Sequence, residues 1–354
     1  MIIGIENTPL ISPHKARGVG FYTKRLIEAL ENLARKNKDF SIKTDSYKSL
    51  ASEADLIHFP FFSPLFLTLP LFKKKPTVVT VHDLIPLKFP KHFPKGVRGS
   101  LKWQIQKFSL KSAKAIITDS LSSKKDIVKL AGIKKEKIFV IYLAADEVFK
   151  PIQNKRYLEK LKKRYNLPQK FVLYVGDFNF NKNVNLLTES CLQLNYPLII
   201  VGRQALQPAK EKSHIENQSL LKFQESAKEN PEKIIRLGFV PTDDLVGIYN
   251  LATIYVQPSI AEGFGLPVLE AMACGCPVIT SQKTSLGEIA GQKALSIDPY
   301  NKNDLVKAIE NCWQKPFLRK KLSSLGIKQA AKFSWEKTAR KTLNVYKGVY
   351  EKRI

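Results

Sequence analysis

QPSIAEGFGLPVLEAMACGCPVITS, residues 257–281, carries the strongest structural signal in the chain. The three residues before it, 254–256, form an apolar β-prone run, and Pro258 ends that run. Within the stretch, Pro267–Cys274 is mostly apolar, begins with a proline that suits a first helical turn, and is followed by a glycine. Residues 276–280 are again apolar and β-prone. The pattern predicts a strand, loop, helix and second strand, as in α/β folds with parallel sheets.

Two carboxylates lie in this stretch, eight positions apart: Glu262 in the loop and Glu270 in the helix. The glycines after Glu262 allow backbone N–H groups to approach a ligand, and helix N-termini attract anions, so a diphosphate suits this loop. Glu270 is then placed to accept hydrogen bonds from a ribose. The alternative interpretation is an ordinary βαβ unit with a glutamate at the helix start and one polar helix position.

The pattern E-G-F-G-L-P-x-L-E-A-M-A-x-G-x-P-V-I resembles the signature of the retaining glycosyltransferases of family 4. The resemblance implies an α/β protein of the GT-B fold, with two Rossmann-like domains whose parallel sheets face an interdomain cleft. It implies an acceptor-side domain over residues 1–165, a nucleotide-sugar-binding domain over 166–333, and a last helix, 334–354, that crosses back onto the first domain. The charge-dense run Lys150–Gln169 is where we expect the boundary.

The resemblance also implies roles for single residues. Glu262 is implied to contact the donor sugar and to act with His82 and Lys182 in catalysis. The implied donor-binding residues are Gly18, Gly20, Arg203, Phe239, Val240, Gly263, Phe264, Gly265, Leu266 and Glu270.

Lys182 is implied to neutralise the diphosphate as it leaves, although a solvated loop lysine is the alternative. The family commonly carries an arginine and an Arg-Lys pair in this segment, where the sequence has Asp177 and Asn181-Lys182. One fewer positive charge at the phosphates weakens donor binding unless Arg203 substitutes.

In the first domain, Gly18-Val19-Gly20 precedes a helical pattern, and we expect a glycine loop there that opens a helix near phosphates. His82 follows an apolar run at 77–81, at the carboxyl end of a predicted strand, where open α/β sheets bind ligands. The resemblance of V-H-D-L-I-P to a family element implies that His82 lies beside the transferred sugar. A purely structural histidine is the alternative. Asp83 either orients the imidazole or caps the following turn.

Charge is unevenly distributed along the chain. Residues 1–165 hold 33 Lys and Arg against 14 Asp and Glu, a net charge of +19 out of +27. Such a surface attracts polyanions, although a lysine-rich, well-solvated surface is the competing explanation. No recognised nucleic-acid-binding motif accompanies the charge, so no nucleic-acid partner is expected.

Phe59–Phe72 is the most apolar run, but it is too short and too interrupted by prolines to span a bilayer. Beside so many lysines it predicts contact with an anionic membrane surface, whereas packing into the domain core is the alternative. The start of the chain lacks the basic region of a signal peptide, and the four cysteines lack metal-ligand spacing. We therefore expect a cytoplasmic protein with reduced thiols. Peripheral binding to the inner face of the membrane is compatible with this expectation.

The resemblance covers nearly the whole chain and implies a retaining, metal-independent transfer of a hexose from a nucleotide sugar to an acceptor hydroxyl. No metal is expected because no Asp-x-Asp lies at a strand end, and no cofactor is expected beyond the donor substrate, for which GDP-mannose is favoured. A saccharide or a polyprenyl-diphosphate-linked saccharide is the implied acceptor, in cell-surface polysaccharide or glycolipid assembly. The alternatives are another GT-B sugar-nucleotide enzyme, and a basic nucleic-acid-binding or scaffold protein on a degenerate GT-B fold.

Overall fold

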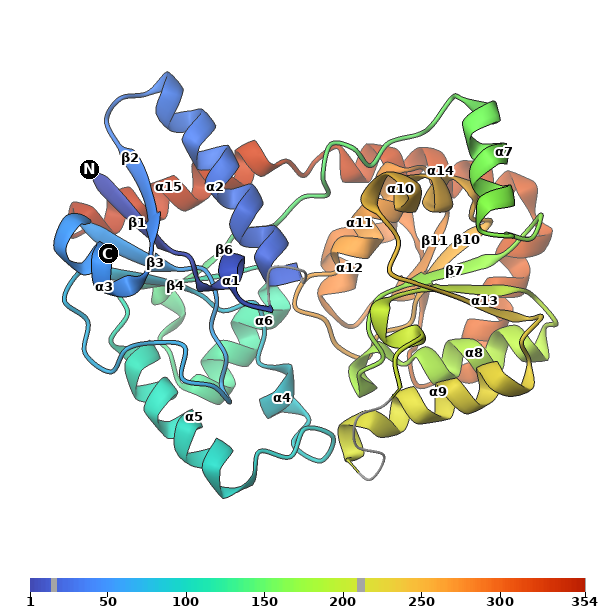
Figure 1. Cartoon of the computed structure of the whole chain (residues 1–354), viewed down its shortest axis with the longest axis horizontal. Coiled ribbons are helices and arrows are strands. Elements are labelled where there is room, and N and C mark those ends of the chain that lie inside the picture. The colour runs from blue at the N-terminus through green and yellow to red at the C-terminus, as the bar shows by residue number, and fades with distance from the viewer. Residues whose placement is uncertain (14–17, 209–213, 354) are drawn as a thin grey trace. The chain divides into compact units, whose positions relative to one another are not determined.

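A computed structural model describes residues 1–13, 18–208 and 214–353. The chain divides into two units: Met1–Leu143 with Phe333–Ile354, and Ala144–Lys332. Each unit contains a six-stranded parallel sheet with helices packed on it (Figure 1), so the expectation of an α/β fold with parallel sheets is confirmed.

The sheet of the first unit has the strand order β2-β1-β3-β4-β5-β6, and all of its pairs are parallel. Its strands are β1 (Ile2–Glu6), β2 (Ser41–Asp45), β3 (Leu56–Phe59), β4 (Thr77–Thr80), β5 (Ala115–Thr118) and β6 (Ile138–Val140). Its helices are α1 (Thr8–Ile11), α2 (Gly18–Lys36), α3 (Tyr47–Glu53), α4 (Ile85–Lys88), α5 (Gly96–Lys111), α6 (Leu121–Asp126) and the C-terminal α15 (Trp335–Tyr350).

The sheet of the second unit has the order β12-β11-β10-β7-β8-β9 and is also parallel. Its strands are β7 (Val172–Val175), β8 (Leu198–Val201), β9 (Ile234–Gly238), β10 (Ile254–Gln257), β11 (Val278–Ser281) and β12 (Leu295–Ile297). Its helices are α7 (Lys155–Arg164), α8 (Val184–Gln193), α9 (Gln218–Glu229), α10 (Thr242–Leu251), α11 (Leu266–Ala273), α12 (Ser285–Ala290), α13 (Lys302–Gln314) and α14 (Pro316–Ala330).

The central strands of both sheets are buried on both faces, as continuous apolar runs predict for parallel sheets. The core of the second unit includes Phe178 and Phe223, whose rings lie 4.4 Å apart between centroids. The core of the first unit includes Phe59, Phe62 and Leu69 from the run Phe59–Phe72. The interpretation of that run as core is therefore correct for these three residues, whereas Phe66, Leu67, Leu71 and Phe72 are exposed.

The division between the units comes after Leu143, earlier than the boundary expected at 165/166. The reason is that α7 packs on α10 of the second unit. Asp244 accepts hydrogen bonds from Tyr165, at 2.6 Å, and from Arg164, at 3.0 Å. A methyl group at Gly247 of α10 would lie 2.3 Å from a Leu161 side-chain carbon, so the two helices are in close contact there.

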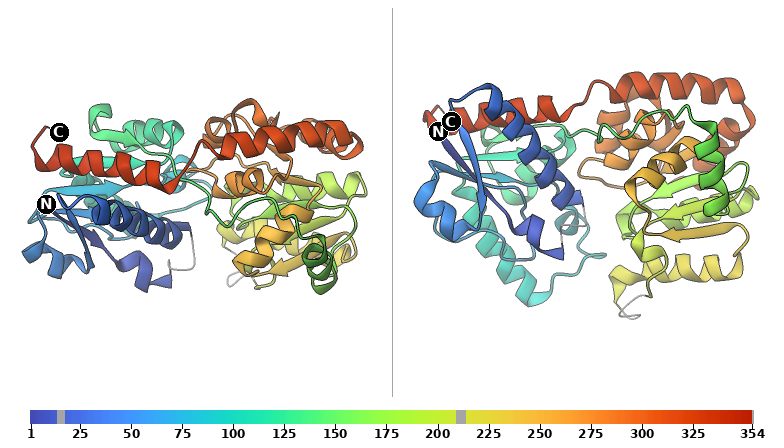
Figure 2. Two further views of the ribbon diagram at one scale, coloured as in Figure 1. Left: turned by 90° about the horizontal axis from the view of Figure 1, so that it is seen from above. Right: turned by 45° about the horizontal axis from the view of Figure 1, so that its top comes forward.

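The last helix, α15, belongs to the first unit, where it lies beside α2 (Figure 2). Thr338 donates a hydrogen bond to the carbonyl oxygen of Tyr142 at 2.7 Å. Farther along α15, the Tyr346 hydroxyl lies 2.6 Å from Nδ1 of His58, a buried residue of β3. These contacts attach the helix to the sheet of the first unit.

Candidate functional site

The stretch 257–281 forms the strand β10, a loop, the helix α11 and the strand β11. Gly265 ends the loop with a φ of 113°, a conformation that favours glycine. A Cβ at this position would lie 2.2 Å from a side-chain carbon of Leu286. Glycine is therefore required at 265 for two reasons, and the first turn of α11 can start directly after it.

Glu262 lies in this loop with its carboxylate buried. Lys182 Nζ donates to both of its oxygens, at 2.9 and 2.7 Å. Gln257 Nε2 and Ser259 Oγ donate to Oε1 at 2.6 and 2.7 Å. These donors satisfy both oxygens of the buried carboxylate and fix the orientation of the Glu262 side chain.

Lys182 reaches Glu262 because the loop after β7 is fastened to the loop after β10. Asn181 is buried, and its Nδ2 donates to the carbonyl oxygen of Ala261 at 2.9 Å. Its backbone carbonyl oxygen accepts a hydrogen bond from the Ile260 N–H at 2.7 Å. Asn183, with a φ of 56°, donates to the carbonyl oxygens of Pro258 and Pro299. Asn181, where the family commonly has a basic residue, thus serves as a clamp between the loops.

Glu270 lies in the second turn of α11 and is partly buried. The Tyr249 hydroxyl of α10 donates to Glu270 Oε2 at 3.0 Å. Burial raises the pKa of Glu270 to about 7, against the lowering effect of this hydrogen bond. Glu270 therefore holds its proton at higher pH than an ordinary glutamate, and further hydrogen-bond donors would favour its charged form.

Arg203 and Phe239 lie together at the carboxyl ends of β8 and β9. The guanidinium carbon of Arg203 is 4.8 Å from the centroid of the Phe239 ring, and both side chains are exposed. Val240 beside them is buried. The backbone makes a close approach here, since a Cβ at Gly202 would lie 2.2 Å from the carbonyl oxygen of Gly176. An exposed apolar ring stacked on a cation suits a planar, anionic ligand such as a nucleotide.

His82 follows β4 in the first unit. Its Nδ1 lies 2.5 Å from Oδ2 of Asp119, at the end of the neighbouring strand β5, and its Nε2 lies 3.2 Å from the Pro60 carbonyl oxygen. The Tyr22 ring contacts the imidazole edge-on, with 4.7 Å between centroids. Asp83 accepts the Ile85 N–H at the start of α4, so Asp119, and not Asp83, orients His82.

The remaining first-unit candidates, Gly18 and Gly20, lie in the first turn of α2. The helix thus begins at the glycines, whereas the sequence predicted a glycine loop ahead of it. Gly18 is exposed and a Cβ there would meet no atom within 4 Å, whereas Gly20 is buried. The preceding residues, 14–17, lie outside the described part of the chain.

The structure thus brings Lys182 and Glu262 into direct contact, with Gly263–Leu266 next to them in the chain, and places His82, Gly18 and Gly20 in the other unit. The sequence analysis missed Gln257, Ser259, Tyr249 and Asp119. Three of these had a usable signal. Gln257 and Ser259 flank Pro258 in the stretch that contains Glu262. For Asp119 the signal was its place after β5, because parallel strands end at the same sheet edge.

Among the residues that the structure describes, no group of three or more His, Cys, Asp or Glu side chains could hold a metal ion. The four cysteines are free and buried. Within the same residues, no helix is both long and apolar enough to cross a bilayer.

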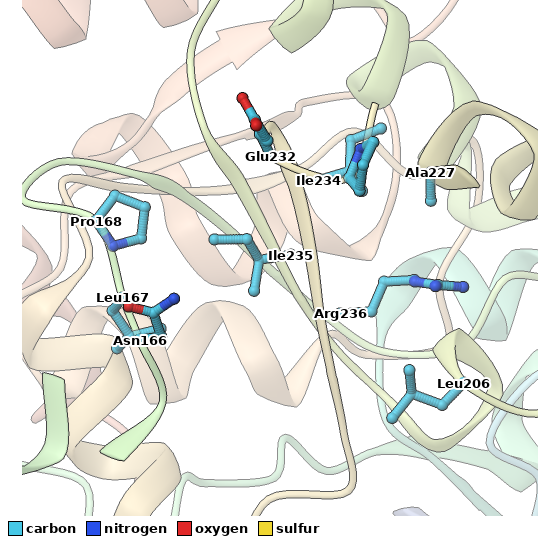
Figure 3. A pocket seen from close by; sticks show the side chains of 10 residues that line it. Asn166, Leu167, Pro168, Leu206, Ala227, Glu232, Ile234, Ile235 and Arg236 are labelled. Carbon is cyan, nitrogen blue, oxygen red and sulfur yellow. The ribbon is translucent and has the colours of Figure 1, made fainter. Parts of the chain in front are cut away.

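A cavity of about 670 Å³ lies along the edge strand β9 of the second unit (Figure 3). Leu167, Leu206, Ile235 and Arg236 contribute to its lining. None of the candidate site residues lines it. It is therefore separate from the loops that hold Lys182 and Glu262.

Known protein families and individual proteins match most of the chain. The family model described as "Glycosyl transferases group 1" matches residues 158–329, and the model described as "Glycosyltransferase Family 4" matches residues 34–148. The O-antigen chain mannosyltransferase B of Escherichia coli is 33% identical over 277 residues, which are 76% of this chain and 70% of that protein. The serotype-specific mannosyltransferase WbdA of Escherichia coli is 30% identical over 271 residues, which are 74% of this chain. This chain spans about a third of the length of WbdA, since the match covers 32% of that protein.

Among solved structures, the sucrose-phosphate synthase of Thermosynechococcus elongatus superposes with a TM-score of 0.78. The superposition covers 99% of both chains at 19% sequence identity, so it shows a shared fold. Together with the sequence matches, it places the chain among the glycosyltransferases of group 1 and family 4, as an enzyme of the GT-B fold.

Proposed function

We propose that this glycosyltransferase transfers a hexose, with retention of anomeric configuration and without a metal ion, from a nucleotide sugar to an acceptor hydroxyl. The observation that carries the proposal is the pairing of Lys182 with Glu262 beside the N-terminus of α11. GDP-mannose is the donor we favour, because both relatives described above are named mannosyltransferases. Their names also support a saccharide acceptor in surface-polysaccharide assembly.

The donor's diphosphate is proposed to bind at Gly263–Leu266, where α11 begins and the positive end of its helix dipole meets the loop. Glu270 would accept hydrogen bonds from the ribose. Phe239 and Val240 would contact the nucleobase, with Arg203 as a further cation beside them. Each of these residues lies in the second unit, so the proposed donor contacts do not depend on the placement of the first.

Negative charge grows on the diphosphate as the bond to the sugar breaks. Lys182 is the cation proposed to stabilise it, and Gln257 and Ser259 keep Glu262 hydrogen-bonded when the ammonium group shifts towards the phosphate. The sequence shows no second carboxylate placed as an obvious nucleophile. We therefore propose transfer on one face of the sugar, with the leaving phosphate accepting the proton from the acceptor hydroxyl.

The acceptor is proposed to be a saccharide carried on a polyprenyl diphosphate, and the first unit to touch an anionic membrane. The contact would use the α5 surface, which we define as Val97, Leu101 and Phe108 of α5 with Phe66, Leu67, Leu71 and Phe72 of the loop between β3 and β4. All seven side chains are exposed, from 44% for Leu71 to 88% for Val97. Positions 97, 101 and 108 share one helix face, since they are four and seven residues apart.

The α5 surface is held in place by hydrogen bonds on the inner side of the helix. Gln106 accepts the Leu69 N–H at 3.0 Å and donates to the Leu69 carbonyl oxygen at 3.2 Å. Lys73 donates to Ser109, and Lys102 Nζ lies 5.6 Å from the centroid of the Phe66 ring. The exposed loop residues are thus fixed on α5 and do not fold back into the core.

The part of the chain that forms the α5 surface is strongly positive. Residues 56–118 contain eleven Lys and Arg and a single acidic residue, Asp83. Exposed aliphatic side chains gain from entering the apolar part of a bilayer, and each lysine or arginine near an anionic surface adds about 1 kcal/mol. Nucleic acid would use the charge and the aromatic rings but not Val97, Leu101, Leu67 and Leu71, so a lipid surface fits better.

We expect GDP-mannose to raise the melting temperature more than UDP-glucose, dTDP-glucose or free mannose. A ligand at 100 times its dissociation constant adds about 2.7 kcal/mol to the free energy of unfolding. Glu270→Ala should abolish the shift, whereas Glu225→Ala, an exposed change on α9, should leave it intact. If no nucleotide sugar raises the melting temperature, the proposed function is wrong; a preference for UDP-glucose would overturn only the donor assignment.

Binding of GDP-mannose should release a proton from Glu270 near pH 7. The pKa of Glu270 is raised to about 7 in the free protein, and donors on the ribose would lower it. Affinity should therefore rise with pH up to about 7 and level off above, with about half a proton released at pH 7. Calorimetry in buffers of different ionisation enthalpy measures this, and GDP-mannose is suitable because its phosphates do not titrate in this range.

Glu270→Gln is the control for that experiment, because it keeps the side-chain size and cannot ionise. Equal proton release by the wild type and by Glu270→Gln would show that Glu270 does not change its ionisation when the nucleotide binds.

The protein should co-sediment with vesicles that contain phosphatidylglycerol, and less with vesicles of phosphatidylcholine alone. Changing Phe66 and Phe72 together to serine should weaken binding at least about tenfold, since each buried phenylalanine contributes about 1.5–3 kcal/mol. Phe317→Ser, at an 82% exposed position on α14 of the second unit, is the matched control. Binding that ignores lipid charge, or that survives the double change, would exclude the α5 surface as the membrane contact.

A further inference from the structure

His82 has an acceptor oxygen in front of each ring nitrogen. The carboxylate Oδ2 of Asp119 lies 2.5 Å from Nδ1, and the carbonyl oxygen of Pro60 lies 3.2 Å from Nε2. A neutral imidazole has one N–H and one lone pair, so either neutral tautomer would place a lone pair against one of these oxygens. An imidazolium donates to both.

Asp119 is suited to hold such a cation. It is 2% exposed, and its second oxygen, Oδ1, is buried without a hydrogen-bond partner among the described residues. A buried carboxylate with so few other donors is stabilised by an adjacent positive charge. The imidazole of His82 is the group in hydrogen-bond contact with it.

A second histidine on the same sheet provides a contrast. His58 of β3 is fully buried, with its Nε2 2.8 Å from Thr80 Oγ1 and its Nδ1 2.6 Å from the Tyr346 hydroxyl. Hydroxyl groups donate or accept as required, so a neutral ring satisfies both bonds. Burial, together with the nearby His82, lowers the pKa of His58 to about 3.

We propose that Asp119 is a positioning residue that keeps His82 as an imidazolium, so that His82 serves the reaction as a fixed positive charge and not as a base. The assignment of His82 to the reaction rests on the proposed function, whereas its charge state rests on the hydrogen bonds alone. A general base needs an available lone pair, and neither ring nitrogen offers one. A fixed cation instead stabilises an electron-rich oxygen of the substrate.

The hydrogen bonds around His58 extend through Thr80 and Tyr22 towards His82. Thr80 Oγ1 also lies 2.9 Å from the Tyr22 hydroxyl, and the Tyr22 ring packs edge-on against the His82 ring. Residues of α2, β3, β4 and α15 therefore form one buried network behind the imidazolium. The network restricts the ring's movement, and Asp119 fixes its charge.

The surroundings of His82 shift its pKa in opposite directions. Burial lowers the pKa of His82, but the charge and hydrogen bond of Asp119, with smaller contributions from Asp83 and the Pro60 carbonyl, raise it above its usual value. His58 stays neutral, and the pKa of Tyr22 is raised by burial and by Asp119, so Tyr22 stays protonated. The imidazolium should therefore persist at pH values where an ordinary histidine has lost its proton.

The test is an NMR titration of protein labelled with ¹⁵N-histidine. The two nitrogens of an imidazolium resonate close together, whereas those of a neutral ring separate widely. We expect His82, assigned by loss of its signals in His82→Gln, to be doubly protonated at pH 7.5, and His58 to be neutral in the same spectrum. In Asp119→Asn, His82 should be neutral at pH 7.5, and Asp119→Glu should restore part of the shift.

Activity provides the second measurement. Asp119→Asn should lower kcat by about 10²-fold, as loss of one preorganised electrostatic partner does, with a smaller change in the donor KM and an unchanged melting temperature. A neutral His82 in the wild type, or a titration unaffected by Asp119→Asn, would overturn the proposal. An imidazolium that forms as expected, with Asp119→Asn fully active, would instead overturn the role of His82 in the reaction.

Discussion

The ion pair between Lys182 and Glu262 joins the two loops from which the candidate donor site is built. One loop follows β7 and the other follows β10, and these strands are neighbours in the sheet, so their carboxyl ends lie side by side. Removing two charges from water is costly, and the pair is stable only because further hydrogen bonds satisfy the carboxylate. Gln257 and Ser259 supply them from the chain just before Glu262.

The clamp residues around the pair explain how the site forms with fewer basic residues than the family pattern. Asn181 stands where the family commonly has a basic residue, and it binds the backbone at Ala261 and Ile260. Lys182 thus supplies the positive charge at this loop. The contacts of Asn181 and Asn183 hold the loop where Lys182 can pair with Glu262. An uncharged side chain therefore connects the two loops at position 181. Arg203, stacked on Phe239, remains as an exposed cation of the same unit.

Sequence reasoning identified the elements whose signal is local. The unit around 257–281 was predicted because glycine, proline and the apolar pattern each act within a few residues, and the structure contains it with α11 shifted by one residue from the predicted helix. The exposed and the buried residues of Phe59–Phe72 could not be told apart from the sequence, since both are apolar. Only tertiary packing distinguishes Phe62 from Phe66.

Features that depend on distant residues were not predicted from local patterns. Asp119 is 37 positions from His82 and was missed as its partner, whereas the cap by Asp83 was one of the two alternatives for that residue. The unit boundary was misplaced because α7 is polar and looked like a linker, while its attachment depends on Asp244, about 80 residues later. The helix start at Gly18 likewise contradicted the local expectation that glycines form a loop.

Lys182 is the cation proposed to stabilise the departing diphosphate, and the turnover of Lys182→Ala tests this role directly. Release of GDP from GDP-mannose with a lipid-linked saccharide acceptor should fall by about 10²–10³ in kcat. Lys222→Ala, which breaks the exposed pair with Glu189 in the same unit, should retain full activity. A folded Lys182→Ala enzyme that keeps most of its activity would show that the ion pair is structural and that another group stabilises the leaving phosphate.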